Sequence, residues 1–231
     1  DNVLDISDWT TPYTLEYLTG IKVYNLGVSG ETSNEIALRQ GGIKMYADNT
    51  FEVGYDDSVE ISIIDEYGNP VYMADFSAYG YVEPHESDVV YINDDMFKIT
   101  GTEETGLYIC RYSEEEDVYD AFTTVYEGTQ IVTKAAHERK NDILILEIGS
   151  NGGWDNYRQL ISQYDAMIQN AGCDYFIIVG DTDDPGTSIA DTAQGFRNDD
   201  GTYVGVGDTA WEATLREAYG EHFINMRTYL I

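Results

Sequence analysis

The sequence predicts an α/β protein whose doubly wound parallel sheet is interrupted by an all-β antiparallel insertion. Three observations support this fold class. Short apolar runs alternate with helical patterns over residues 1–42 and again over residues 138–231. Between them, over residues 43–137, the apolar period becomes two. The run "DILILEIG" is apolar almost throughout, as expected for a strand covered on both faces.

The first part reads as helix, strand, helix. "TPYTLEYLTG" predicts a helix that begins near Pro12 and ends at Gly20. "KVYNLG" predicts a short buried strand. "ETSNEIALRQGG" predicts a helix that is capped by Thr32 or Ser33 and ended by the two glycines.

The middle part, residues 43–137, is expected to form an inserted β domain. "SVEISIIDEYGNPVYMADF" alternates, turns at "YGNP" and resumes. Further strands are predicted at "MFKIT", "GLYICRYS", "VYDAFTTVY" and "TQIVT". Regular short strands separated by glycine and acidic turns favour antiparallel pairing.

The last part returns to the βα pattern and joins residues 1–42 in one discontinuous α/β domain. "DILILEIG", "YFIIVGDT" and "HFINM" are the expected strands, and "TAWEATLREAYG" is an expected helix. "NYRQLISQYDAMIQNAG" predicts a helix that ends at Gly172, with one apolar stripe of Leu160, Ile161, Tyr164, Met167 and Ile168. Residues 183–207 are expected to form a long loop.

Charge and composition restrict the classes of partner. The 231 residues carry 43 acids against 12 bases, a net charge of −31, which repels phosphate backbones and anionic membranes. We therefore expect neither nucleic acid nor a membrane as partner, and no apolar run has the length of a membrane span. With 20 tyrosines and few lysines, the chain resembles extracellular or cell-surface proteins, and tyrosine suits carbohydrate contact.

Other features of the sequence leave alternatives open. No signal peptide begins at Asp1, which favours a mature or trimmed chain. Cys110 and Cys173 are compatible with a disulfide or with two buried thiols, and neither has a metal-binding spacing. The sequence predicts no cofactor and no metal. Self-assembly and the oligomeric state are left open.

Two loops at predicted strand ends could carry chemistry. In "GVSGET" the glycines allow a main-chain N–H to approach a ligand closely. In "EIGSNGGWDN" the side-chain amide of Asn151 is an uncharged donor suited to a developing anion. Ligands bind beyond the carboxyl ends of parallel strands, so Ser29, Gly152, Asp181 and Asp183 are further candidates for contact with a substrate.

The paired motifs "YNLGVSGETSNEIALRQGG" and "ILILEIGSNGGWDN" resemble those of the SGNH hydrolases, also called GDSL esterases, in a branch with a β insertion. "EAYGEHFINMRTYL" is similar to the last strand of that branch. The resemblance implies a flavodoxin-like fold and a secreted serine esterase. It also implies that Gly30 and Asn151 form the oxyanion hole, and that an acylated carbohydrate or small ester is the substrate.

The chain departs from that family in its catalytic groups. The Gly-Asp-Ser block would fall just upstream of Asp1, and the Asp-x-x-His block beyond Ile231. The nucleophile and the base are therefore expected outside this chain, because His85, His137 and His222 lie in no recognisable spacing with a serine. The alternative is a non-catalytic carbohydrate-binding or surface-assembly protein on a degenerate scaffold.

Overall fold

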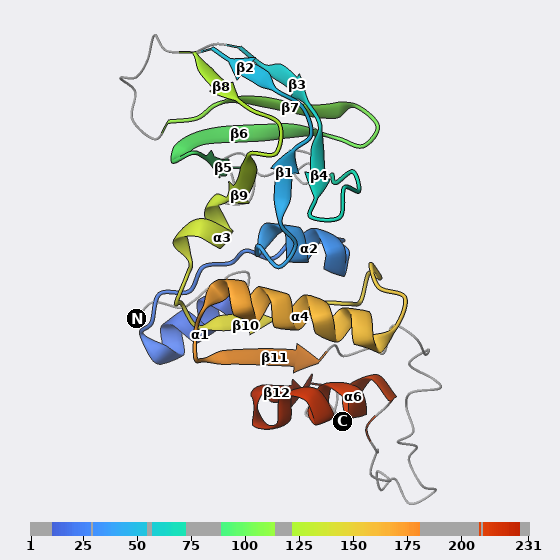
Figure 1. Cartoon of the computed structure of the whole chain (residues 1–231). Coiled ribbons are helices and arrows are strands. Elements are labelled where there is room, and N and C mark those ends of the chain that lie inside the picture. The colour runs from blue at the N-terminus through green and yellow to red at the C-terminus, as the bar shows by residue number, and fades with distance from the viewer. Residues whose placement is uncertain are drawn as a thin grey trace, which may run out of the picture.

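The structure is a computed structural model and describes residues 11–28, 30–54, 57–72, 89–113, 122–180, 208 and 210–226. Its β unit is shown at the top of Figure 1, with α2 between it and a smaller part made of helices and parallel strands. The helices are α1 (Thr11–Thr19), α2 (Ser33–Arg39), α3 (Lys134–Glu138), α4 (Tyr157–Ala171) and α6 (Ala210–Tyr219), with a 3-10 turn, η3 (Gly220–His222).

The β unit is a seven-stranded antiparallel sheet that nearly closes on itself. Its order is β3-β7-β6-β5-β9-β1-β4, and the two outermost strands, β3 and β4, are separated in the chain only by Ser62. A two-stranded ribbon of β2 and β8 completes the unit. The bounds are β1 (Met45–Ala47), β2 (Phe51–Val53), β3 (Val59–Ile61), β4 (Ile63–Asp65), β5 (Val89–Ile92), β6 (Asp95–Thr102), β7 (Gly106–Arg111), β8 (Thr123–Val125) and β9 (Gln130–Thr133).

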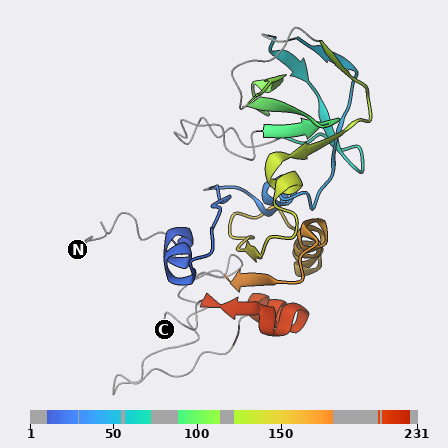
Figure 2. The ribbon, with the colours of Figure 1, turned by 90° about the vertical axis from the view of Figure 1, so that its left-hand side faces the viewer.

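The parallel part has three strands in the order β10-β11-β12, which are β10 (Leu144–Leu146), β11 (Phe176–Gly180) and β12 (Phe223–Asn225). Both neighbouring pairs are parallel. Figure 2 shows α4 and α6 together on one side of these strands and α1 on the other.

The predicted doubly wound parallel sheet is wrong. The described strands pair mostly antiparallel, and the parallel pairing among them is confined to β10, β11 and β12. The predicted strand "KVYNLG" forms no ladder, and the Tyr24 side chain is 46% exposed. A doubly wound sheet has crossover helices on both faces. Here the strand predicted at residues 22–27 does not form, and both crossover helices, α4 and α6, lie on one face.

Two hydrophobic cores hold the described residues together. One fills the β unit and the other lies between α4, α6 and the parallel strands. Helix α2 joins them because Leu38 belongs to the first core and Ala37 to the second. Ile43, which follows α2, packs against both.

Local signals for helix ends are confirmed. Thr32 caps α2, and its side chain accepts a hydrogen bond from the Glu35 backbone while the Glu35 side chain accepts from Thr32. Helix α4 ends at Gly172 in a left-handed conformation. Leu160, Tyr164 and Met167 of the predicted stripe are buried.

Cys110 and Cys173 are both free thiols. Burial raises the pKa of the Cys110 thiol above its ordinary value, with Lys98 acting in the opposite direction.

Candidate functional site

The two predicted donor loops lie against each other. We call residues 26–28 and 30–32 the first loop, and residues 149–155 the second loop. The Asn151 side-chain nitrogen donates to the Glu31 carbonyl at 3.1 Å. The Ser33 backbone nitrogen, at the start of α2, donates to the Gly152 carbonyl at 3.0 Å. The loops are therefore joined by direct hydrogen bonds. Among the described residues, β10, which precedes the second loop, pairs with β11 and not with residues 22–27, which precede the first loop.

Gly153 brings the second loop into contact with the first turn of α2. A Cβ atom at Gly153 would lie 2.8 Å from the Ser33 backbone nitrogen and 2.9 Å from that of Asn34. Gln163 of α4 secures this contact, because its side-chain nitrogen donates to the Asn34 side chain at 2.6 Å and to the Gly153 carbonyl at 2.9 Å. The approach requires a residue without a side chain at position 153.

The second loop is also fixed from its own side. The Gly149 carbonyl accepts from the Gly152 nitrogen at 3.2 Å and from the Trp154 indole nitrogen at 2.9 Å. The Tyr164 hydroxyl donates to the Ile148 carbonyl at 3.0 Å. These bonds define the backbone path on both sides of Asn151.

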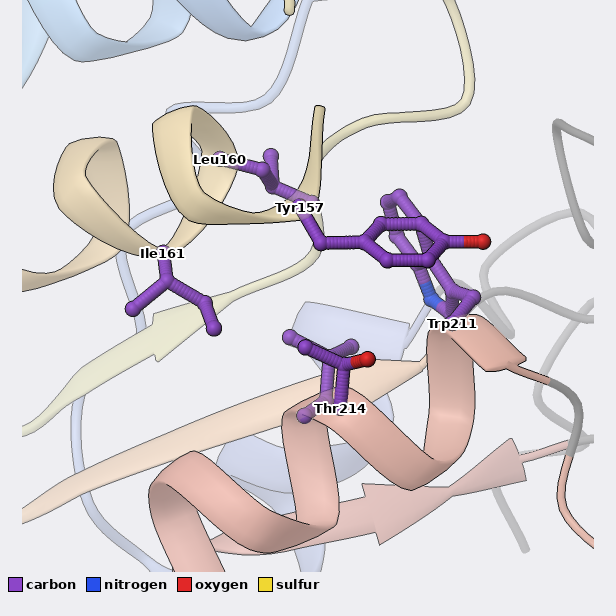
Figure 3. Close-up of a pocket in the computed structure, with 6 residues that line it drawn as sticks. Tyr157, Leu160, Ile161, Trp211 and Thr214 are labelled. Carbon is purple, nitrogen blue, oxygen red and sulfur yellow. The ribbon is translucent and has the colours of Figure 1, made fainter. Parts of the chain in front are cut away.

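Trp154 of the second loop packs in an aromatic cluster with Tyr157 and Trp211. The Trp154 ring lies 5.1 Å from the Trp211 ring and 5.6 Å from the Tyr157 ring, measured between centroids. Figure 3 shows Tyr157 and Trp211 beside an apolar hollow. This hollow is too narrow to admit a water molecule, and its lining is Tyr157, Leu160, Ile161, Trp211, Thr214 and Leu215. The cluster therefore packs the loop in place and offers no cavity for a ligand.

The site residues predicted from the sequence lie as follows. Gly30 is exposed, with a φ of 85°, and directly precedes the residue whose carbonyl binds Asn151. Asn151 is exposed and Gly152 half-buried. Ser29, Asp181 and Asp183 lie outside the described residues. A carboxamide has two N–H donors, so Asn151 can bind Glu31 and a ligand oxygen at the same time.

A buried ion pair beneath the first loop was not predicted. The Arg39 guanidinium donates to the Glu31 carboxylate, and both side chains are almost fully buried. Burial raises the pKa of the Glu31 carboxyl, while the Arg39 charge acts in the opposite direction. The two residues are eight apart, a spacing that suggests no pairing on a helix, and the sequence held no other signal of the contact.

Two histidines contact residues outside both loops. The His137 ring stacks on Tyr91 at 4.3 Å between centroids. His222 stacks on Phe176 at 4.1 Å, and its Nδ1 lies 2.9 Å from the Phe176 carbonyl oxygen. His85 is outside the described residues.

Within the described ranges, no group of three or more His, Cys, Asp or Glu side chains is placed to hold a metal ion. In the same part of the chain, no helix combines the length and apolarity needed to cross a membrane.

Comparison of the chain with protein-family models, with curated proteins and with solved structures finds no significant match to any of them. The assignment of a function therefore depends on the chemistry of the two loops.

Proposed function

We propose that the two loops are the oxyanion-binding part of a secreted carboxylic ester hydrolase of the SGNH type. The nucleophilic serine and the histidine base would come from outside this chain. The observation that supports the proposal is the bond from Asn151 to the Glu31 carbonyl, which brings an uncharged carboxamide next to the residue that follows Gly30.

Ester hydrolysis needs such donors because the carbonyl oxygen becomes negative in the tetrahedral intermediate. Fixed N–H groups stabilise that charge without reorganisation at the moment of reaction. The Gly30 N–H and the second N–H of Asn151 are the candidate donors, and the hydrogen bonds around Gly149 and Gly153 keep the loops rigid. Ser29, Gly152, Asp181 and Asp183 remain candidates for substrate contact.

The net charge favours an uncharged substrate. A chain with a charge of −31 repels anions, so a neutral ester, such as an acyl group on a polysaccharide, suits it better than an anionic one. An extracellular or cell-surface location agrees with such a substrate.

The test is a comparison of two asparagine variants of the complete gene product with p-nitrophenyl acetate as substrate. Asn151→Ala should lower kcat by about 10²–10³-fold because one oxyanion donor is lost. Asn170→Ala is the matched control, since the Asn170 amide also donates to a backbone carbonyl, that of Gln40, at 2.9 Å. Asn170→Ala should leave kcat unchanged. Equal turnover in the wild type and Asn151→Ala would refute the proposal.

A second candidate is carbohydrate binding without catalysis. Phe122 and Tyr126 lie at the two ends of β8 and are 72% and 66% exposed. Exposed aromatic rings can stack on sugars. A complete gene product that lacks esterase activity but migrates more slowly in polysaccharide gels, with the delay lost in Phe122→Ala/Tyr126→Ala, would favour this candidate over the hydrolase.

A further inference from the structure

The Arg39 side chain spans the first loop from one end to the other. Arg39 is the last residue of α2, and its guanidinium points back under the loop. One terminal nitrogen donates to the Leu26 carbonyl and the other to the Glu31 carboxylate. Leu26 and Glu31 are the residues on either side of the glycine-containing turn. A single planar group therefore fixes the separation of its two ends.

The buried ion pair between Glu31 and Arg39 is expected to add little to the free energy of unfolding. Arg39 is 1% exposed and Glu31 is 3% exposed. The desolvation of two charges offsets most of their attraction, and apolar pairs of similar volume often replace buried ion pairs without loss of stability. An apolar pair could not reproduce the directional hydrogen bonds from Arg39 to Leu26 and Glu31.

Arg39 is itself anchored to the β unit. Its carbonyl accepts a hydrogen bond from the Thr133 hydroxyl at 2.5 Å. Thr133 is fully buried, and the same hydroxyl caps α3 by accepting from the Ala136 nitrogen at 3.1 Å. The anchor is therefore a rigid junction between β9 and α3.

Glu31 links this anchor to the second loop. Its carboxylate binds Arg39, and its carbonyl accepts from the Asn151 amide. A chain of hydrogen bonds thus runs from Thr133 through Arg39 and Glu31 to Asn151.

We propose that Arg39 is a positioning residue that holds the first loop in the conformation in which Gly30 and Asn151 face the same ligand. The effect of Arg39 on the loop conformation follows from the contacts above, whereas its effect on turnover rests on the proposed function. Lysine should not reproduce this arrangement, because its single nitrogen would have to reach two acceptors that two separate guanidinium nitrogens now bind.

The test compares three forms of the complete gene product. These are the wild type, Arg39→Lys, and the double variant Glu31→Leu/Arg39→Met, which leaves no charge buried without its partner. Hydrogen exchange by mass spectrometry follows the peptide that covers residues 24–33, with the β6 peptide as internal reference. The midpoint of urea unfolding and the kcat and KM for p-nitrophenyl acetate are measured on the same samples.

We expect exchange in the first loop to rise about tenfold or more in both variants, with the β6 peptide unchanged. The double variant should keep the unfolding midpoint of the wild type, which separates positioning from stability. We expect kcat to fall by about 10²-fold, with KM nearly unchanged, because misplaced donors affect the reacting centre.

Wild-type protection of the first loop in the folded double variant would overturn the proposal, whatever the turnover. Faster exchange together with an inactive wild type would leave the positioning role standing and refute only the proposed function. Should Arg39→Lys fail to fold, the double variant decides the question alone.

Discussion

Gly153 is the residue at which the second loop packs against the first turn of α2. Its φ is 84°, and a Cβ atom there would meet two backbone nitrogens at the start of α2. Backbone atoms cannot turn aside as a flexible side chain can. Any larger residue must therefore separate the second loop from α2 and move Asn151 away from Glu31.

We predict that Gly153→Ala is more destabilising than Gly68→Ala. Gly68 has the same φ of 84° but open space around its Cβ position, so it measures the conformational cost alone. That cost is about 1–2 kcal/mol, and the clash at Gly153 should add about 1–3 kcal/mol. Urea unfolding of both variants measures the difference. Equal losses would mean that the second loop does not pack closely against α2.

The sequence predicted the role of a single residue correctly where that residue and its partner are close in the chain. The capping role of Thr32 and the helix end at Gly172 depend on residues only a few positions away. The pairing of Glu31 with Arg39 depends on the path of the chain between them, which no local pattern specifies. The same reason explains why the sequence suggested Asn151 as a donor but not its bond to the Glu31 carbonyl.

At the scale of elements, the segment of residues 22–27 shows why an apolar run does not guarantee a strand. It has the composition of a strand, but no described strand pairs with it in a β ladder. Tyr24 lies under the Arg139 guanidinium, 3.5 Å from the ring centroid, and remains partly exposed. Strand formation depends on pairing with a neighbour, which the sequence of one segment cannot show. The antiparallel strands β6 and β7 were easier to predict because they pair with each other across a single turn of the chain, whereas β5 was not predicted.

The turn after β4 makes the stability depend on pH. The Asp65 carboxylate accepts hydrogen bonds from the backbone nitrogens of Tyr67 and Asn69, each at 2.8 Å, and from the Asn69 side chain at 2.9 Å. Burial alone would raise the pKa of Asp65, but these hydrogen bonds outweigh it and lower the pKa below its ordinary value. A lowered pKa means that the folded state favours the ionised form. The resulting stability is present above the ordinary pKa of aspartate and is lost as the pH falls through the folded-state pKa.

We predict that Asp65→Asn lowers the free energy of unfolding at pH 7 by about 0.5–1 kcal/mol, a small value because solvent screens the group. The gap from the wild type should shrink as the pH falls below about 4, near the ordinary pKa of aspartate. Urea unfolding at a series of pH values measures it. Glu66→Gln, which removes a charge from the next position but not these hydrogen bonds, should have a smaller effect at pH 7. A gap that widens toward low pH would contradict the role given to Asp65.

At the scale of the whole molecule, the net charge of −31 opposes the compact state. Self-repulsion among 43 acidic residues is only partly offset by 12 basic ones. Ion pairs such as Arg216 with Asp208, 2.6 Å apart, relieve it only locally. Salt shortens the range of this repulsion from about 30 Å at 0.01 M to about 3 Å at 1 M.

The melting temperature should therefore rise when sodium chloride is increased from about 0.01 M to about 0.5 M, a range over which screening becomes short. Differential scanning calorimetry in the presence of a chelator measures the effect and excludes a contribution from contaminating divalent ions. A melting temperature that falls or stays constant would show that like-charge repulsion does not limit the stability of this chain.

In the proposed hydrolase, Gly30 and Asn151 donate to the same developing oxyanion. The most direct measurement is a crystal structure of the complete gene product after reaction with a p-nitrophenyl phosphonate ester, which modifies an activated serine and resembles the tetrahedral intermediate. We predict a phosphonyl oxygen about 2.7–3.1 Å from both the Gly30 nitrogen and the Asn151 Nδ2. A phosphonyl oxygen bound elsewhere, with Asn151 bonded only to Glu31, would show that these two donors do not form an oxyanion hole.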